Sequence, residues 1–328
     1  MFIWQKSAWT AWSKLRERLP HAVLLQGGEG WGEFEFARTA AQSLLCEKPK
    51  SEAGPCGECQ ACTWFALGNH PDFRLVVPES LAGEPEEGAE PGKKRSDQIR
   101  IEQVRDLADF LSVGTHRGGL RVILIYPAEA MNANTQNALL KSLEEPAPAT
   151  VFLLVSTQPD RLLPTVRSRC RKFTLPMPDA QQVVAWLKEG GVAHPESALA
   201  ASGGAPLAAL KAAGTDADRL AFIEGIGRPG FDPVALAETV QGVPLWDLVG
   251  WLQRWSFDLL LARATGRVRY HLNQEKRITE IALRCPATAI TSYLRRLAQA
   301  RSLARHPLNP KLFVEDLLLQ YQRMLGQP

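Results

Sequence analysis

The sequence has no uninterrupted apolar run of the roughly 18 residues that a membrane-spanning helix needs, so we expect none. Residues 1–19 carry Lys6, Lys14, Arg16, Glu17 and Arg18 and no long apolar stretch, so we expect no secretory signal peptide. A net charge of +3 over 328 residues neither demands nor excludes a nucleic-acid partner. The sequence also has no internal repeat. These features predict a cytoplasmic protein of two or three domains.

Cysteine is scarce, but four of the six cysteines fall within residues 46–62. In a reducing compartment such a cluster favours a metal site over disulfides. The short spacing lets the thiolates converge on one ion, and no histidine or carboxylate joins them. All-sulfur tetrahedral ligation is typical of structural zinc, with an iron–sulfur cluster and unliganded thiols as the alternatives. The predicted ligands are Cys46, Cys56, Cys59 and Cys62.

The sequence has the glycine spacing of a phosphate-binding loop but lacks the side chains that bind phosphate and Mg²⁺. Residues 23–34 run from an apolar strand through a glycine-rich turn into a helix, and Gly27 and Gly32 have the spacing of the motif G-x-x-x-x-G-K-[ST]. Glu33 stands where the phosphate-binding lysine belongs, and Phe34 replaces the hydroxyl residue that holds Mg²⁺. A carboxylate repels a triphosphate and a phenyl ring cannot bind a metal ion, so we expect a degenerate nucleotide site.

The second element of an ATPase site is lost as well. An Asp-Glu pair should follow an apolar strand to bind Mg²⁺ and orient the attacking water. Here the strand at residues 122–125 is followed by Tyr126 and Pro127, and Glu129 is a poor substitute. Because both motifs are lost independently, we expect no ATP hydrolysis by this chain.

The order of elements predicts an α/β domain followed by helices. Short, β-branched apolar stretches alternate with helical patterns up to residue 175, which is typical of a mostly parallel sheet. After Pro176-Met-Pro178 only helical periodicity remains. We therefore predict domains at 1–175, 176–213 and 214–328. The expected strands are 23–26, 73–77, 122–126 and 151–156, and the clearest expected helices are 33–46, 101–111, 135–143, 245–264 and 310–325.

Residues 79–97 are rich in proline, glycine and charge. This composition predicts a mobile surface loop, and its acidic-then-basic pattern leaves a docking element as the alternative.

An arginine stands at a position suited to act on a neighbouring subunit. Ser168-Arg169-Cys170 follows an apolar strand and a proline-containing loop. From such a rim an arginine can reach the γ-phosphate bound by an adjacent protein and stabilise charge in the transition state. The alternative is an ordinary surface or salt-bridged arginine.

Together these segments resemble the delta-prime subunits of bacterial DNA polymerase III clamp loaders, which are members of the AAA+ family. The resemblance covers about residues 21–175, and beyond them it is one of architecture and helical character. The motifs that carry it are His21-Ala-Val-Leu-Leu-Gln-Gly, the four clustered cysteines, His70-Pro71-Asp72, Asn137-Ala-Leu-Leu-Lys-Ser-Leu-Glu-Glu-Pro146 and Leu162-Leu-Pro-Thr-Val-Arg-Ser-Arg-Cys170.

The resemblance implies an AAA+ P-loop core with an inserted zinc module, a small helical lid and an all-α collar that oligomerises. It further implies a stator that does not hydrolyse ATP. Such a subunit sits in a ring with the delta and gamma/tau subunits, and this ring loads the sliding clamp onto primed DNA. Arg169 would complete the ATP site of a neighbouring gamma/tau subunit.

The lid departs from the pattern of active relatives, because Pro206 follows Gly203-Gly204-Ala205 where a nucleotide-sensing arginine is expected. This agrees with a dead site. The competing hypotheses are an active ATPase of the gamma/tau type and a zinc-dependent DNA-binding or scaffolding protein unrelated to clamp loading.

Overall fold

The computed structural model describes residues 1–49, 54–83, 95–116, 118–212, 216–304 and 309–326. The chain divides into two compact units, Met1–Asp179 and Ala180–Pro328. The first boundary lies four residues beyond the predicted one at 175. The predicted division between lid and collar falls at 213–215, outside the described residues, and stays a prediction. Among the described helices, none is both long enough and apolar enough to cross a membrane.

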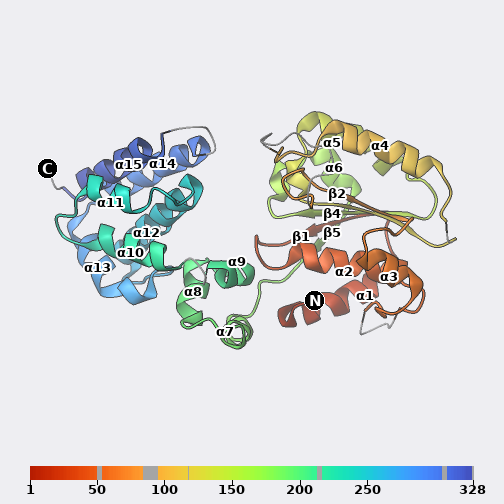
Figure 1. Ribbon diagram of the computed structural model, residues 1–328, viewed down its shortest axis with the longest axis horizontal. Coiled ribbons are helices and arrows are strands. Elements are labelled where there is room, and N and C mark those ends of the chain that lie inside the picture. The colour runs from red at the N-terminus through yellow and green to blue at the C-terminus, as the bar shows by residue number, and fades with distance from the viewer. Residues whose placement is uncertain (50–53, 84–94, 117, 213–215, 305–308, 327–328) are drawn as a thin grey trace. The chain divides into compact units, whose positions relative to one another are not determined.

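The first unit is built on a five-stranded, fully parallel sheet with the order β2-β3-β4-β1-β5. Helices cover both of its faces (Figure 1). The strands are β1 (Ala22–Gln26), β2 (Phe73–Val76), β3 (Arg121–Ile125), β4 (Thr150–Ser156) and β5 (Arg171–Thr174). The helices are α1 (Lys6–Arg16), α2 (Glu33–Leu45), α3 (Gln60–Ala66), α4 (Ile101–Ser112), α5 (Ala133–Glu144) and α6 (Pro164–Arg169).

Successive side chains along each strand point to opposite faces of the sheet, and this alternation creates two apolar cores. Val23 and Leu25 of β1 face the layer formed by α1, α2 and α3, whereas Ala22 and Leu24 face α4, α5 and α6. Both faces of the central strands β1, β3 and β4 are apolar because these strands are buried on both sides. The parallel register carries the carboxyl ends of β1 and β4 to one edge, where Gln26 pairs with Ser156. Ligand sites of parallel α/β folds lie at that edge.

Among the described strands, β5 is the one that sequence reasoning missed. It reads Arg-Lys-Phe-Thr and is mostly exposed, so it has none of the apolar character of a central strand. It forms because β1 offers an open edge: Val23 to Gln26 pair with Arg171 to Thr174. Its inward residue, Phe173, packs against Trp12 and Phe36.

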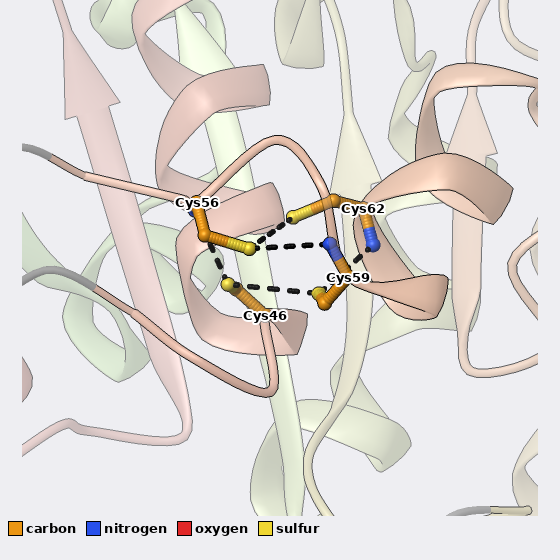
Figure 2. Close-up of side chains that lie close together, drawn as sticks. All are labelled: Cys46, Cys56, Cys59 and Cys62. Atoms are coloured by element: carbon orange, nitrogen blue, oxygen red, sulfur yellow. Dashed lines mark hydrogen bonds between the residues drawn. The ribbon is translucent and has the colours of Figure 1, made fainter.

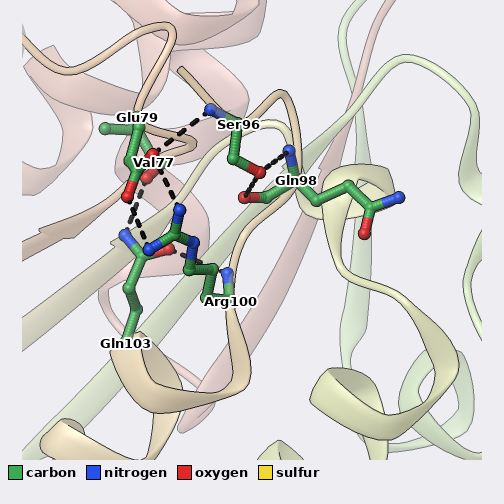
Figure 3. Close-up of polar contacts among 6 residues, drawn as sticks. All are labelled: Val77, Glu79, Ser96, Gln98, Arg100 and Gln103. Carbon is green, nitrogen blue, oxygen red and sulfur yellow. Dashed lines mark hydrogen bonds and ion pairs between the residues drawn. The ribbon is translucent and has the colours of Figure 1, made fainter. Parts of the chain in front are cut away.

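Hydrogen bonds and an ion pair join the two described ends of the connection between β2 and α4. Glu79 accepts a hydrogen bond from the Ser96 amide at 3.2 Å and pairs with Arg100 at 2.9 Å (Figure 3). Gln103 donates to the Val77 carbonyl at 2.9 Å. The predicted mobile loop lies largely within residues 84–94, which are outside the described residues.

The second unit is helical. Its longest helix, α12, packs against α13 and α14, and its core includes the buried Trp255 and Tyr321. The indole Nε1 of Trp255 donates to the Tyr321 hydroxyl at 2.7 Å. The helices are α7 (Ala180–Glu189), α8 (Pro195–Ala201), α9 (Pro206–Ala212), α10 (Asp216–Gly227), α11 (Pro233–Thr239), α12 (Leu245–Thr265), α13 (Glu275–Arg284), α14 (Ala287–Leu303) and α15 (Pro310–Met324).

The predicted fold class is confirmed, with a parallel α/β core, an inserted four-cysteine module and a helical C-terminal region. Predicted ends of the named strands and helices differ from the observed ones by at most two residues.

Candidate functional site

The glycine-rich loop leaves the carboxyl end of β1 and enters α2 through Gly32, whose φ of 83° lies in the left-handed region. The loop is closely packed by side chains. A Cβ atom on Gly28 would lie 2.3 Å from the Trp31 ring, and one on Gly32 would lie 2.5 Å from the Phe2 ring. Side chains of the protein therefore lie directly against both glycines.

Glu33 turns back into this loop. Its side chain is buried, and one carboxylate oxygen accepts a hydrogen bond from the Trp31 amide at 3.2 Å. Burial raises the pKa of Glu33 above its ordinary value, while the backbone N–H groups of Glu33, Trp31 and Gly30 act in the opposite direction. In an intact motif such loop amides cradle phosphate. Here the chain's own carboxylate binds to them.

The N-terminal segment closes the loop from outside. The Trp4 indole donates a hydrogen bond to the Trp31 carbonyl at 2.9 Å. The side-chain amide of Gln5 donates one to the Gly32 carbonyl at 2.7 Å. Both side chains are buried. Sequence reasoning did not find this contact, because nothing in residues 2–5 indicates which loop they cover.

Two residues of the predicted degenerate nucleotide site meet in the fold. Phe34 stacks on Tyr126, with ring centroids 4.6 Å apart. Burial raises the pKa of the Tyr126 hydroxyl, and the charge of Glu33 raises it further. Glu129 accepts hydrogen bonds from the Thr157 amide and hydroxyl at 3.0 and 2.7 Å. An aromatic pair thus occupies the region where Mg²⁺ ligands would be expected, and Pro127, after Tyr126, offers no side-chain ligand.

Arg169 is the last residue of α6 and is partly exposed, with 34% of its side-chain area accessible. Its guanidinium forms an ion pair with Glu144, the last residue of α5, and donates to the Thr165 carbonyl at 2.9 Å. Glu144 belongs to the Leu-Glu-Glu-Pro end of α5. Sequence reasoning treated that stretch as a helix end and did not predict the pair.

The four clustered cysteines converge on one point (Figure 2). Cys46 caps the C-terminus of α2, and Cys59 caps the N-terminus of α3. The Cys46 and Cys59 sulfurs lie 3.9 Å apart, as do those of Cys56 and Cys62, and all four ligand atoms lie within 4.8 Å of one another.

These distances fit one tetrahedral ion. With metal–sulfur bonds of about 2.3 Å, ligand sulfurs lie roughly 3.8 Å apart. An iron–sulfur cluster places several iron atoms between its thiolates and needs wider spacing, so the geometry favours a single ion. The site can therefore hold a metal ion, and its sulfur-only set leaves no protein ligand suited to acid–base chemistry.

The sulfurs also receive backbone hydrogen bonds. The amides of Cys56, Cys59 and Cys62 donate to the sulfurs of Cys46, Cys56 and Cys59. Hydrogen bonds from the backbone at Glu58 and Cys59 lower the pKa of Cys56 to about 6, whereas burial raises the pKa of Cys62 to about 12. Donors aimed at sulfur stabilise the thiolate form that a metal requires.

The comparison with known families decides the class. The sequence model described as "DNA polymerase III, delta subunit" matches residues 5–179. The DNA polymerase III subunit delta′ of Pseudomonas aeruginosa is 37% identical over 350 residues, covering 99% of this chain and 98% of that protein. The chain belongs to the DNA polymerase III delta-prime family.

Two further relatives match only part of the chain. Subunit delta′ of Escherichia coli K12 is 34% identical over 193 residues, 58% of this chain and 53% of that protein. Subunit tau of the same organism is 33% identical over 186 residues, 56% of this chain and 26% of that protein. The delta-prime family therefore shares sequence with tau over about half of this chain.

Proposed function

We propose that the chain is the non-hydrolysing stator of a DNA polymerase III clamp loader in the cytoplasm. In this role it assembles with delta and gamma/tau subunits into the ring that loads the sliding clamp onto primed DNA. It contributes Arg169 in trans to the ATP site of a neighbouring gamma/tau subunit. The observation that carries the proposal is the glycine-rich loop, whose amides hold the buried Glu33 carboxylate.

The loss of hydrolysis is supported by charge and by packing. A triphosphate entering the loop would meet the Glu33 carboxylate and would need to displace the Trp31 ring from Gly28. Mg²⁺ would meet Phe34 stacked on Tyr126. Coulomb repulsion at short range inside a protein exceeds that in water, so these changes oppose nucleotide binding as well as catalysis.

The role of Arg169 is supported by its accessibility. Among the described residues, its guanidinium is held by one exposed ion pair, to Glu144, and one carbonyl contact. Exposed pairs contribute about 0–1 kcal/mol, so the side chain can exchange Glu144 for a phosphate oxygen at small cost. A planar guanidinium suits bidentate contact with phosphate.

The metal proposed for the cysteine site is zinc, in a structural role. Cys46, Cys56, Cys59 and Cys62 would hold it by their thiolates, and it would tie the end of α2 to the start of α3. Four thiolates around one tetrahedral ion are typical of structural zinc.

The nearest alternative is an active ATPase of the gamma/tau type, and ATP binding by the isolated chain separates the two. We expect no saturable binding of ATP–Mg²⁺ by calorimetry at millimolar nucleotide and no hydrolysis above background. Purified gamma/tau serves as the positive control. Saturable binding together with hydrolysis above background by this chain would refute the non-hydrolysing role. Failure of the chain to co-purify with gamma/tau and delta would instead refute the ring assembly proposed here.

A further inference from the structure

An arginine-lined pocket of about 290 Å³ opens on the second unit. Arg254 and Phe257 of α12 form one side, and Leu294 and Arg301 of α14 form another. Tyr270, from the segment that follows α12, also lines the pocket, as do Gly250 and Gln253. The pocket combines positive charge with apolar and aromatic surface. None of its residues belongs to the nucleotide loop, the arginine rim or the cysteine site.

Among the described residues, none forms a hydrogen bond or ion pair that balances the charge of Arg254. The Arg254 side chain is partly buried. Burial lowers the pKa of Arg254; Tyr270 and Asp247 oppose this effect, while Arg301 and Arg219 add to it. Asp247 is exposed to solvent. A partly desolvated cation without a hydrogen-bonded acid is costly in the free chain.

The buried carboxylate on the same helix is already occupied. Asp258 accepts hydrogen bonds from the amides of Arg269, Tyr270 and His271 at 2.8 to 3.1 Å. Its Oδ2 also lies 2.9 Å from His271 Nδ1. These contacts fix the backbone of Tyr270 beside the pocket. They occupy the Asp258 carboxylate, which therefore forms no ion pair with Arg254.

The second arginine of the pocket is held in position. Arg301 donates to the Gln253 side-chain carbonyl at 2.7 Å, and its guanidinium carbon lies 4.0 Å from the Trp246 ring centroid. Fixing a long side chain in advance reduces the entropy that a ligand must overcome. The pocket therefore offers one positioned guanidinium beside a second that has no partner among the described residues.

We propose that this pocket receives an acidic side chain from another protein subunit. A carboxylate would accept hydrogen bonds from Arg254, and an adjoining apolar side chain would pack against Phe257 and Leu294. The pocket volume of about 290 Å³ has room for such a side chain. Arginine and aromatic residues are also enriched in protein interfaces. This inference rests on the proposed role as a subunit of a hetero-oligomer.

The test replaces Arg254 by Met, which keeps an apolar stem, and by Gln. The full-length variants are titrated with purified gamma/tau and delta, and assembly is followed by sedimentation velocity at several salt concentrations. We expect roughly a tenfold or greater weakening of assembly. The free variants should melt at the same temperature as the parent or higher, because they no longer desolvate an unbalanced charge. Arg267→Gln is the matched control: it removes the same charge from an exposed position outside the pocket and should assemble normally.

Unchanged assembly of both Arg254 variants would overturn the inference and leave the proposed clamp-loader role standing. Calorimetric binding of inorganic phosphate or AMP to the parent, abolished in Arg254→Gln, would also overturn it by making the pocket a phosphate site. Failure of the unaltered chain to assemble at all would overturn both proposals.

Discussion

Glu33 decides at the scale of one residue what the glycine-rich loop can do. The sequence alone predicts its position, because the spacing from Gly27 and Gly32 fixes where a lysine would stand. Its contact with the Trp31 amide could not be predicted, since local sequence does not tell whether a carboxylate turns inward or toward solvent. The same holds for Trp4 and Gln5, which reach the loop across 26 or more residues.

Replacing Glu33 by Gln tests this inward position through its pH dependence. The folded pKa of Glu33 is raised above its ordinary value of 4.5, so the unfolded state ionises first as pH rises. Stability that depends on the protonated form is present below pH 4.5 and is lost as pH rises through the folded pKa. The amide of the substituted side chain would stay neutral throughout. We expect E33Q to melt at a higher temperature than the parent at pH 7 and at a similar temperature near pH 4, as measured by calorimetry.

A gap in melting temperature that is constant between pH 4 and pH 7 would contradict this account of Glu33. Glu102→Gln is the control, because Glu102 lies in the first turn of another helix, α4, and is exposed. It should show no comparable dependence on pH.

At the scale of elements, α2 links the glycine-rich loop to the cysteine cluster. It begins at Gly32 and ends at Cys46, whose sulfur belongs to the cysteine cluster. Spacing predicted the ligands because Cys56, Cys59 and Cys62 are each separated from the next by two residues and can converge on one ion with Cys46. Strand β5 could not be found in this way, since its existence depends on pairing with β1 rather than on its own composition.

Replacing Cys59 by Ser should remove one metal ligand and one cap of α3. Loss of an outer-shell partner alone typically weakens metal binding about 10–100-fold, so loss of a direct ligand should weaken it at least as much. We expect zinc near one equivalent in the parent, measured by elemental analysis, and much less in C59S after mild chelation. The melting temperature should fall with it, because metal binding is coupled to folding.

The buried Cys170, which is outside the cluster, supplies the control for metal content. C170A should keep its zinc. Equal zinc in C59S and the parent, or full stability of the parent after complete chelation, would contradict a structural metal at this site.

At the scale of the whole molecule, the predicted degenerate nucleotide site is closely packed, whereas Arg169 is accessible. The residues of that predicted site are Gly27, Gly32, Glu33, Phe34, Tyr126 and Pro127. The motifs of residues 21–175 were enough to predict the fold and the family. The arginine pocket of the second unit could not be predicted, because Arg254, Tyr270 and Arg301 meet only through the packing of α12 and α14.

The most direct test of the central claim is ATP hydrolysis by a reconstituted complex of this chain with gamma/tau, delta, the clamp and primed DNA. Arg169→Ala is compared with the parent and with Arg167→Ala, a neighbouring arginine that pairs with Asp160 at 2.7 Å. All three complexes must first be shown to assemble equally. Arginine fingers contribute about 10³–10⁵ to the rate at their site.

We predict that R169A removes the contribution of one ATP site to the pre-steady-state burst, while R167A leaves it intact. Arg169→Lys should recover little, because an ammonium cannot form the bidentate contact. An unchanged burst in a fully assembled R169A complex would contradict an arginine supplied in trans.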